Sequence, residues 1–215
     1  MKKIKIRYAT KSKFKHEEVK RVIASELLLN PHGAEVSAAD YFEVEFPPVA
    51  TDEPLERNLE TMVRHKAISA YKGLLEPCIV EHAGLILNGY AKQNYPGGLT
   101  QPMWDALDAE GFLKSVSWAG PNVTARAVVG YCDGMNVFTF VGETQGKLSA
   151  SPRGERDFYW DTVFIPLDAS EGLTYAEISA AENGLAEKIK LSQSKKAMVQ
   201  CLEFMLKKDP IMFPR

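Results

Sequence analysis

Residues 4–29 read IKIRYATKSKFKHEEVKRVIASELLL, and this stretch decides the fold class. Apolar and polar side chains alternate from Ile4 to Ala9, which predicts a β-strand. A polar turn follows over residues 10–15, and apolar side chains then recur along one side of a predicted helix from His16 to Leu29. A strand that leads directly into a helix is typical of α/β proteins.

The rest of the chain repeats this alternation of strands and helices. The hydrophobic periodicity predicts further strands at 41–46, 79–80, 85–87, 124–132 and 136–141, and further helices at 55–72, 104–116, 174–182 and 192–207. Asp133-Gly134 predicts a tight hairpin turn between two of the strands. We therefore expect one α/β domain over residues 1–215.

Composition excludes several classes of protein. The chain has 215 residues, of which 45% are hydrophobic, so it is long enough to bury a core without disulfide bonds or structural metal ions. A net charge of −2 argues against a protein that coats nucleic acid polymers. Cys78, Cys132 and Cys201 lack the spacing of a zinc site, and Cys78 is expected to be buried. We expect a cytoplasmic protein without a membrane partner, because no apolar run is long enough to span a bilayer.

The turn after the first predicted strand is a candidate anion site. Thr10, Ser12 and Lys15 lie between a strand and a helix N-terminus, where free backbone N–H groups and the helix dipole favour negative charge. The turn has no glycine, so it is not a P-loop. A solvated basic turn is the alternative.

Two acidic clusters are candidates for catalysis or metal binding. Glu53, Glu56 and Glu60 have the spacing that would place them on one helix face, although a solvated acidic first turn has the same pattern. Glu81 and His82 follow an apolar run, so we expect them at a strand end that opens onto a crevice. A structural histidine is the alternative at His82.

A loop over residues 152–161 mixes charged and aromatic side chains. Phe158 and Trp160 suit stacking on a nucleobase, and they equally suit packing against the edge of the core.

The order and content of these pieces resemble the inosine triphosphate pyrophosphatase family, which hydrolyses non-standard purine nucleoside triphosphates to monophosphates and pyrophosphate. The matching motifs lie at Thr10 and Lys15, Lys66-Ala67, Glu81 to Leu85, Pro96-Gly97, 152–154 with 157–161, Thr174 to Glu177, and Lys188 with Ser192. Five positions depart from the family pattern: Lys11 and Ser12 stand where the family's first turn has glycine and asparagine, His82 replaces the second acid of a pair, and Gln193 and Ser194 replace histidine and arginine.

The resemblance implies an elongated mixed β-sheet flanked by helices, with two lobes around a central nucleotide cleft, and a homodimer. It also implies a triphosphate ligand with Mg²⁺, or alternatively Mn²⁺. The implied roles are phosphate binding by Thr10, Ser12, Lys15 and Lys188; metal binding by Glu53 or Glu56 and by Glu81; base binding by Phe158, Trp160, Asp161 and Gln193; and catalysis by Glu81 and His82.

The histidine at position 82 leaves three hypotheses for the reaction. Glu81 takes over as the catalytic acid, His82 acts as a base with changed metal use, or hydrolysis is lost. Because Mg²⁺ prefers oxygen ligands, we expect hydrolysis to depend on Glu81 more than on His82. The rival classes are a nucleotide-binding regulatory protein on the same scaffold and a structural interaction protein.

Overall fold

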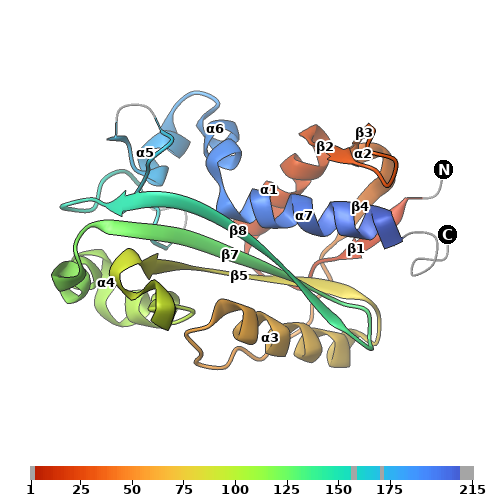
Figure 1. Cartoon of the computed structure of the whole chain (residues 1–215), viewed down its shortest axis with the longest axis horizontal. Helices are drawn as coiled ribbons and strands as arrows, with labels where there is room; N and C mark the ends of the chain where they lie inside the picture. Colours follow the sequence, from red (N-terminus) through yellow and green to blue (C-terminus); the bar gives the residue numbers. More distant parts are fainter. Residues whose placement is uncertain (1–2, 156–158, 170–171, 209–215) are drawn as a thin grey trace.

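A five-stranded antiparallel sheet forms the centre of the molecule in the computed structural model, which describes residues 3–155, 159–169 and 172–208 (Figure 1). Its strands are β6 (Pro96–Gly97), β5 (Cys78–Leu87), β7 (Asn122–Cys132), β8 (Val137–Leu148) and β9 (Phe164–Pro166), in that order. β7 and β8 form the predicted hairpin. The mixed α/β class expected from the sequence is confirmed.

Two smaller sheets accompany the central one. β1 (Ile4–Arg7) pairs in parallel with β4 (Phe42–Glu45), and Tyr8 extends β1 to a parallel bridge with Ile79 of β5. β2 (Leu27–Leu29) and β3 (Glu35–Ser37) form a short antiparallel pair. The bridge at Tyr8 brings the turn that follows β1 to the middle of the central sheet.

Helices cover both faces of the central sheet. α3 (Leu59–Leu74) lies on one face, and α7 (Gln193–Lys208) crosses the other beside α1 (Lys13–Ser25) (Figure 1). The remaining helices are α2 (Ala38–Tyr41), η1 (Asn88–Gln93), α4 (Thr100–Val116), η2 (Ser117–Ala119), α5 (Tyr175–Ala180) and α6 (Gly184–Leu191). No described helix is long and apolar enough to cross a membrane.

Side chains of β5 alternate between these two faces, as the pleat of a strand requires. Cys78 and Val80 pack with α3, whereas Ile79 and Leu85 pack in the larger core that includes α7. Every residue of β5 is buried. The prediction that Cys78 is buried is confirmed.

The predicted helix over residues 16–29 was wrong at both ends. α1 begins at Lys13, because the Ser12 side chain caps it, and ends at Ser25. Leu27–Leu29 instead forms β2, with only its central leucine buried, because Val36 and its neighbours supply a pairing strand. Helix propensity was overridden here by tertiary pairing.

Two further corrections concern the acidic segments. α3 begins at Leu59, where the Asn58 side chain accepts hydrogen bonds from the first backbone N–H groups, so Glu53 and Glu56 precede the helix and share no helix face with Glu60. Glu81 and His82 lie within β5 and not at its end, because the pairing with β7 is continuous through both residues.

The close approach of α7 to β8 generates a prediction. A Cβ added at Gly142 would lie 2.0 Å from the carbonyl oxygen of Gln193, so Gly142→Ala must push the start of α7 away from the sheet. We expect the free energy of unfolding to fall by about 1–3 kcal/mol, as overpacking typically costs. Chemical denaturation measures this change.

Gly89→Ala is the matched control, because the nearest atom to its added Cβ is 4.0 Å away. It should change stability by less than about 0.5 kcal/mol, as surface substitutions usually do. Equal effects of the two substitutions would contradict the contact between β8 and α7.

Candidate active site

A cavity of about 800 Å³ opens beside the middle of β5. The turn at residues 9–15 forms one wall, and residues 49–51 with Glu53 and Lys66 form another. His82 and Ala83 line it from β5, Gln101 and Asp105 from α4, and Tyr159 and Trp160 from the loop after β8. The cavity therefore gathers four of the segments that the sequence singled out.

The turn between β1 and α1 has the geometry expected of an anion site. Ser12 is the N-cap residue of α1 and accepts a hydrogen bond from the backbone N–H of Lys15 at 3.4 Å. The hydroxyl of Thr10 accepts one from the backbone N–H of Ser12 at 3.2 Å. The positive end of the helix dipole faces the cavity that these residues line.

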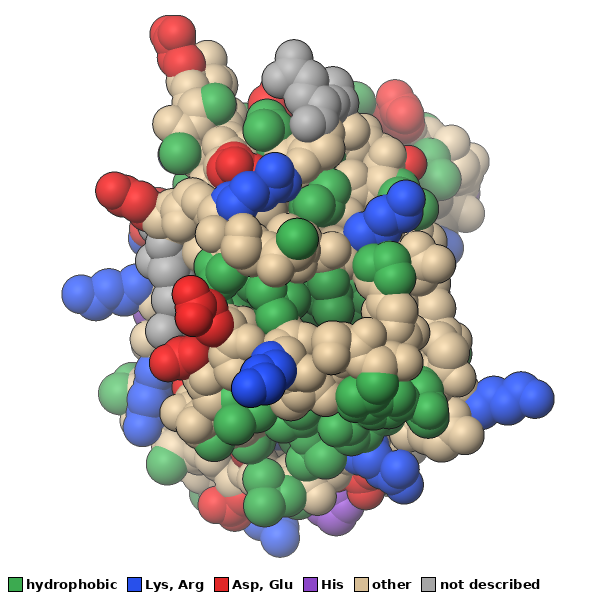
Figure 2. Space-filling view, turned by 90° about the vertical axis from the view of Figure 1, so that its left-hand side faces the viewer, with side chains coloured by type: hydrophobic (Ala, Val, Ile, Leu, Met, Phe, Trp, Pro, Cys, Tyr) green, Lys and Arg blue, Asp and Glu red, His purple; other side chains and the backbone are tan. Residues whose placement is uncertain are grey.

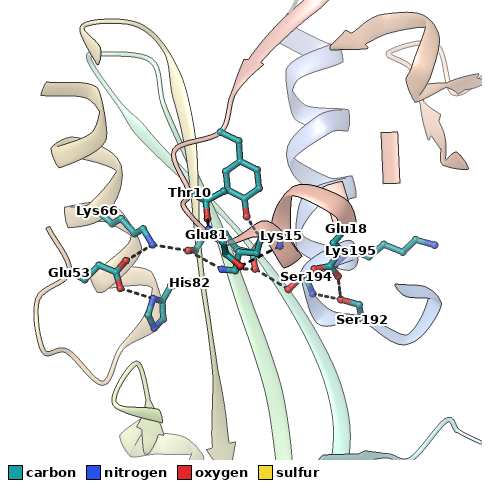
Figure 3. A network of polar contacts seen from close by, with 12 residues as sticks. Thr10, Lys15, Glu18, Glu53, Lys66, Glu81, His82, Ser192, Ser194 and Lys195 are labelled. Atoms are coloured by element: carbon teal, nitrogen blue, oxygen red, sulfur yellow. Dashed lines mark hydrogen bonds and ion pairs between the residues drawn. The ribbon is translucent and has the colours of Figure 1, made fainter. Parts of the chain in front are cut away.

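Two lysines converge on one backbone oxygen at the floor of the cavity. The ammonium groups of Lys15 and Lys66 donate to the carbonyl of Glu81 at 3.3 and 3.2 Å (Figure 3). Burial lowers the pKa of Lys66, Lys15 lowers it further, and Glu53 opposes both. The sequence marks Lys66 only as part of the Lys66-Ala67 motif. Nothing in the residues around it indicates that its ammonium group lies close to that of Lys15.

Glu53 joins Lys66 to His82. One carboxylate oxygen lies 2.5 Å from the Lys66 ammonium, and the other lies 3.3 Å from Nδ1 of His82 (Figure 3). The contacts with His82 and Lys66 hold the pKa of Glu53 well below its usual value although burial opposes them. Burial lowers the pKa of His82, and the hydrogen bond with Glu53 opposes that shift.

Glu81 points away from this cavity. Its carboxylate accepts hydrogen bonds from Tyr8 at 2.6 Å and Ser194 at 2.9 Å, and it lies 3.1 Å from the Lys15 ammonium. Among the described residues, it is not part of the cavity lining. The pKa of Glu81 is lowered because Lys15, Tyr8 and Ser194 outweigh the effect of burial.

A second buried carboxyl lies beside Glu81. Glu18 accepts a hydrogen bond from the Ser192 hydroxyl at 2.6 Å. Burial and the neighbouring Glu81 raise the pKa of Glu18 to about 7. These two carboxyls share a region that is separate from the large cavity.

The three glutamates that were expected to bind a metal lie in different surroundings. Glu56 accepts a hydrogen bond from the backbone N–H of Asn58, and Glu81 faces the opposite side of β5 from Glu53. Within the described residues, no three His, Cys, Asp or Glu side chains form a metal-binding group. Of the three, only Glu53 lines the large cavity, and the metal-binding roles of Glu53, Glu56 and Glu81 stay predictions.

Asp161, which was expected to bind the base, and Lys188, which was expected to bind phosphate, are paired with each other. Lys188 forms a buried ion pair with Asp161, and its ammonium lies 4.2 Å from the centre of the Phe14 ring. Lys188 lines a small adjoining cavity together with Lys15, and it is not part of the lining described for the large one.

The other three residues that were expected to bind the base do not take part in this ion pair. Trp160 is buried, lines the large cavity and packs against the rings of Phe164 and Tyr175. The amide oxygen of Gln193 accepts a hydrogen bond from the Tyr175 hydroxyl at 3.2 Å. Phe158 lies outside the described residues.

The chain is similar in sequence to known proteins over most of its length. A dITP/XTP pyrophosphatase from Methanopyrus kandleri is 32% identical over 204 residues, which cover 94% of this chain and 96% of that protein. An inosine triphosphate pyrophosphatase 2 from Trypanosoma cruzi is 30% identical over 159 residues, which cover 73% of this chain and 74% of that one.

A comparison with solved structures and a match to a family sequence model agree with these relatives. The structure of a HAM1 protein from Coxiella burnetii superposes with a TM-score of 0.69 at 18% identity, and the match covers 94% of this chain and 98% of that one. The sequence model of the Ham1 family matches residues 6–204. The resemblance to inosine triphosphate pyrophosphatases noted in the sequence is thereby confirmed, and the chain belongs to the Ham1 family.

Proposed function

We propose that this protein is a nucleoside triphosphate pyrophosphatase that hydrolyses its substrate to a nucleoside monophosphate and pyrophosphate. The observation that carries the proposal is the convergence of Lys15 and Lys66 on the Glu81 carbonyl beside the N-terminus of α1. Two ammonium groups and free backbone N–H groups suit a polyphosphate. The names of the relatives from M. kandleri and T. cruzi support the same reaction.

In this mechanism the lysines and the helix N-terminus neutralise the charge that grows on the phosphoryl oxygens as water attacks. Thr10 and Ser12 hold the turn in the conformation that presents its N–H groups. A divalent cation, Mg²⁺ or Mn²⁺, is expected to arrive as the complex with the triphosphate, where it adds positive charge at the phosphates.

We further propose that the base preference differs from that of typical relatives. Ser194 is short, and its hydroxyl donates to Glu81, so it offers no cation to a purine carbonyl. Gln193 keeps amide donors and acceptors. Trp160 and Asp161 would shape the base pocket with Phe158, and Lys188 would reach phosphate only if its ion pair with Asp161 opened.

The protein is also proposed to form a homodimer. Large apolar side chains are exposed at the end of the molecule that holds α4, among them Tyr90, Leu107 and Trp118. The rings of Tyr90 and Trp118 meet edge to face at 4.7 Å. Figure 2 shows this end of the molecule, on which hydrophobic side chains gather around a hollow. Such a patch is typical of a protein interface.

The dimer prediction is tested by light scattering. We expect the mass of two chains for the wild type and of one chain for Trp118→Asp, because a buried carboxylate would be left without a partner. Met135→Asp, at a 93% exposed position in the β7–β8 turn, is the control and should leave the mass unchanged. A wild-type mass of one chain would contradict the dimer.

The two lysines are tested by nucleotide binding. We expect Lys15→Gln and Lys66→Gln each to weaken binding of an inosine triphosphate analogue with a methylene at the α–β bridge by roughly 10- to 100-fold, since a charged hydrogen bond contributes about 1.5–3 kcal/mol. Calorimetry at two salt concentrations measures this loss.

Lys72→Gln is the matched control, because Lys72 is exposed on the same helix as Lys66. Unchanged affinity in both cavity variants, with melting temperatures preserved, would remove the triphosphate from this site.

Substrate class is tested by a screen of nucleoside triphosphates that follows pyrophosphate release and thermal stabilisation together. We expect pyrophosphate and not single phosphate as the product, and a ranking of kcat/KM among the nucleotides that differs from that of the M. kandleri relative assayed alongside. Thermal stabilisation without product from every nucleotide would favour the binding-only alternative, because ligands stabilise the native state without turnover.

A further inference from the structure

The histidine at position 16 contacts the turn between β1 and α1 from outside the cavity. Its Nε2 lies 3.0 Å from the carbonyl oxygen of Thr10, at the start of that turn. A carbonyl oxygen only accepts hydrogen bonds, so Nε2 carries the hydrogen and donates it. His16 is not part of the lining described for the large cavity, whereas every residue from Ala9 to Lys15 is.

Packing holds the imidazole ring in place. The ring stacks on that of Phe46, which follows β4, with the ring centroids 3.8 Å apart and the planes inclined by 27°. Phe46 in turn lies 6.1 Å from the ring of the fully buried Tyr8. The backbone N–H of His16 donates to the carbonyl of Ser12, the N-cap residue of α1, at 3.1 Å. The donor atom of His16 is therefore fixed relative to both β1 and α1.

The hydrogen bond from His16 sets the direction of the peptide group between Thr10 and Lys11. The C=O and the N–H of a planar trans peptide point in opposite directions. Because the Thr10 carbonyl is directed at the His16 ring, the backbone N–H of Lys11 is directed away from that ring. This N–H has no hydrogen-bond partner within the part of the chain that the structure describes. It is a free donor beside the cavity that Lys11 lines.

The turn has no other device that would orient this peptide. In nests of backbone N–H groups, residues in the left-handed conformation turn successive N–H groups toward an anion. Residues 9–15 include no glycine, and none of them has a positive φ. The N–H of Thr10 donates to the Tyr8 carbonyl at 3.0 Å, and its hydroxyl accepts from Ser12 at 3.2 Å, which leaves the direction of the Thr10 carbonyl to His16.

We propose that His16 is a positioning residue that holds the Lys11 backbone N–H toward the cavity, where it donates a hydrogen bond to a phosphate oxygen of the nucleotide. The assignment rests on the proposed pyrophosphatase function and names a backbone donor of that site together with the side chain that orients it. Lys15 and Lys66 supply positive charge from flexible side chains, whereas the oriented N–H adds a fixed direction to phosphate recognition.

The test separates the donor atom of His16 from its bulk. Glutamine places its amide nitrogen about where histidine has Nε2, so His16→Gln should keep the affinity for the methylene analogue of inosine triphosphate within about threefold. His16→Met keeps a long side chain without a donor and should weaken binding about tenfold or more, as loss of a hydrogen bond to a charged group does. Calorimetry well below the melting temperatures measures both affinities.

The matched controls are His65→Gln and His65→Met, because His65 is exposed on α3. Both should bind the analogue as the wild type does. Phe46→Leu provides a second route to the same effect, since it keeps the His16 donor and removes the ring that holds it. It should weaken binding and add little to His16→Met, because both changes act on one contact.

A second measurement observes the Lys11 N–H directly. Thr10-Lys11 is the only Thr-Lys pair in the sequence, so isotope labelling of threonine carbonyls and lysine nitrogens selects this one amide in an NMR spectrum. At saturation with the analogue, its proton resonance should move downfield in the wild type and in His16→Gln, and much less in His16→Met. A histidine that only stabilised the fold would not change this response.

Three outcomes overturn the assignment in distinguishable ways. Equal affinities of His16→Gln and His16→Met would show that the donor atom of His16 does not matter for binding. A Lys11 amide that is unaffected in the saturated wild type would remove this N–H from the site and leave the pyrophosphatase function standing. Failure of the wild type to bind the analogue and to release pyrophosphate from any nucleotide would overturn both proposals.

Discussion

Two ionisable side chains, Glu81 and His82, lie next to each other in a strand that is buried over all ten of its residues. Neighbouring residues of a strand face opposite sides of the sheet, so each side chain needs its own partners. Burying an unpaired charge costs several kcal/mol, and the elements around β5 supply what is needed. Tyr8, Lys15 and Ser194 satisfy Glu81, and Glu53 meets His82.

This arrangement also explains why the cavity suits an anion. The backbone oxygen of Glu81 accepts hydrogen bonds from Lys15 and Lys66 together, so two ammonium groups are held close in a partly buried space. Lys15 is paired with the Glu81 carboxylate and Lys66 with Glu53, yet burial and then the nearby Lys15 still lower the pKa of Lys66. A polyphosphate would relieve the repulsion between the two ammonium groups, which ties the stability of the site to its ligand.

Several features of the fold and site were accessible from the sequence, each through a local pattern. The alternation at residues 4–9 and the hairpin signal at Asp133-Gly134 depend on neighbouring residues alone, and both predicted elements formed. The helix boundaries at Ser25 and Leu59 failed because a pairing strand and an asparagine cap decided them. α6 was missed, since eight residues offer little periodicity to detect.

The sequence by itself determined the α/β class, the family resemblance and the presence of histidine where an acid is usual, because these depend only on residue order and type. Only the tertiary structure decided which carboxylate faces the cavity. Glu53 and Glu56 are equivalent in local pattern, but Glu53 reaches Lys66 and His82, while Glu56 bonds the backbone beside it. Contacts between residues far apart in the chain, such as that of Glu81 with Ser194, depend on how whole elements pack, which no local spacing encodes.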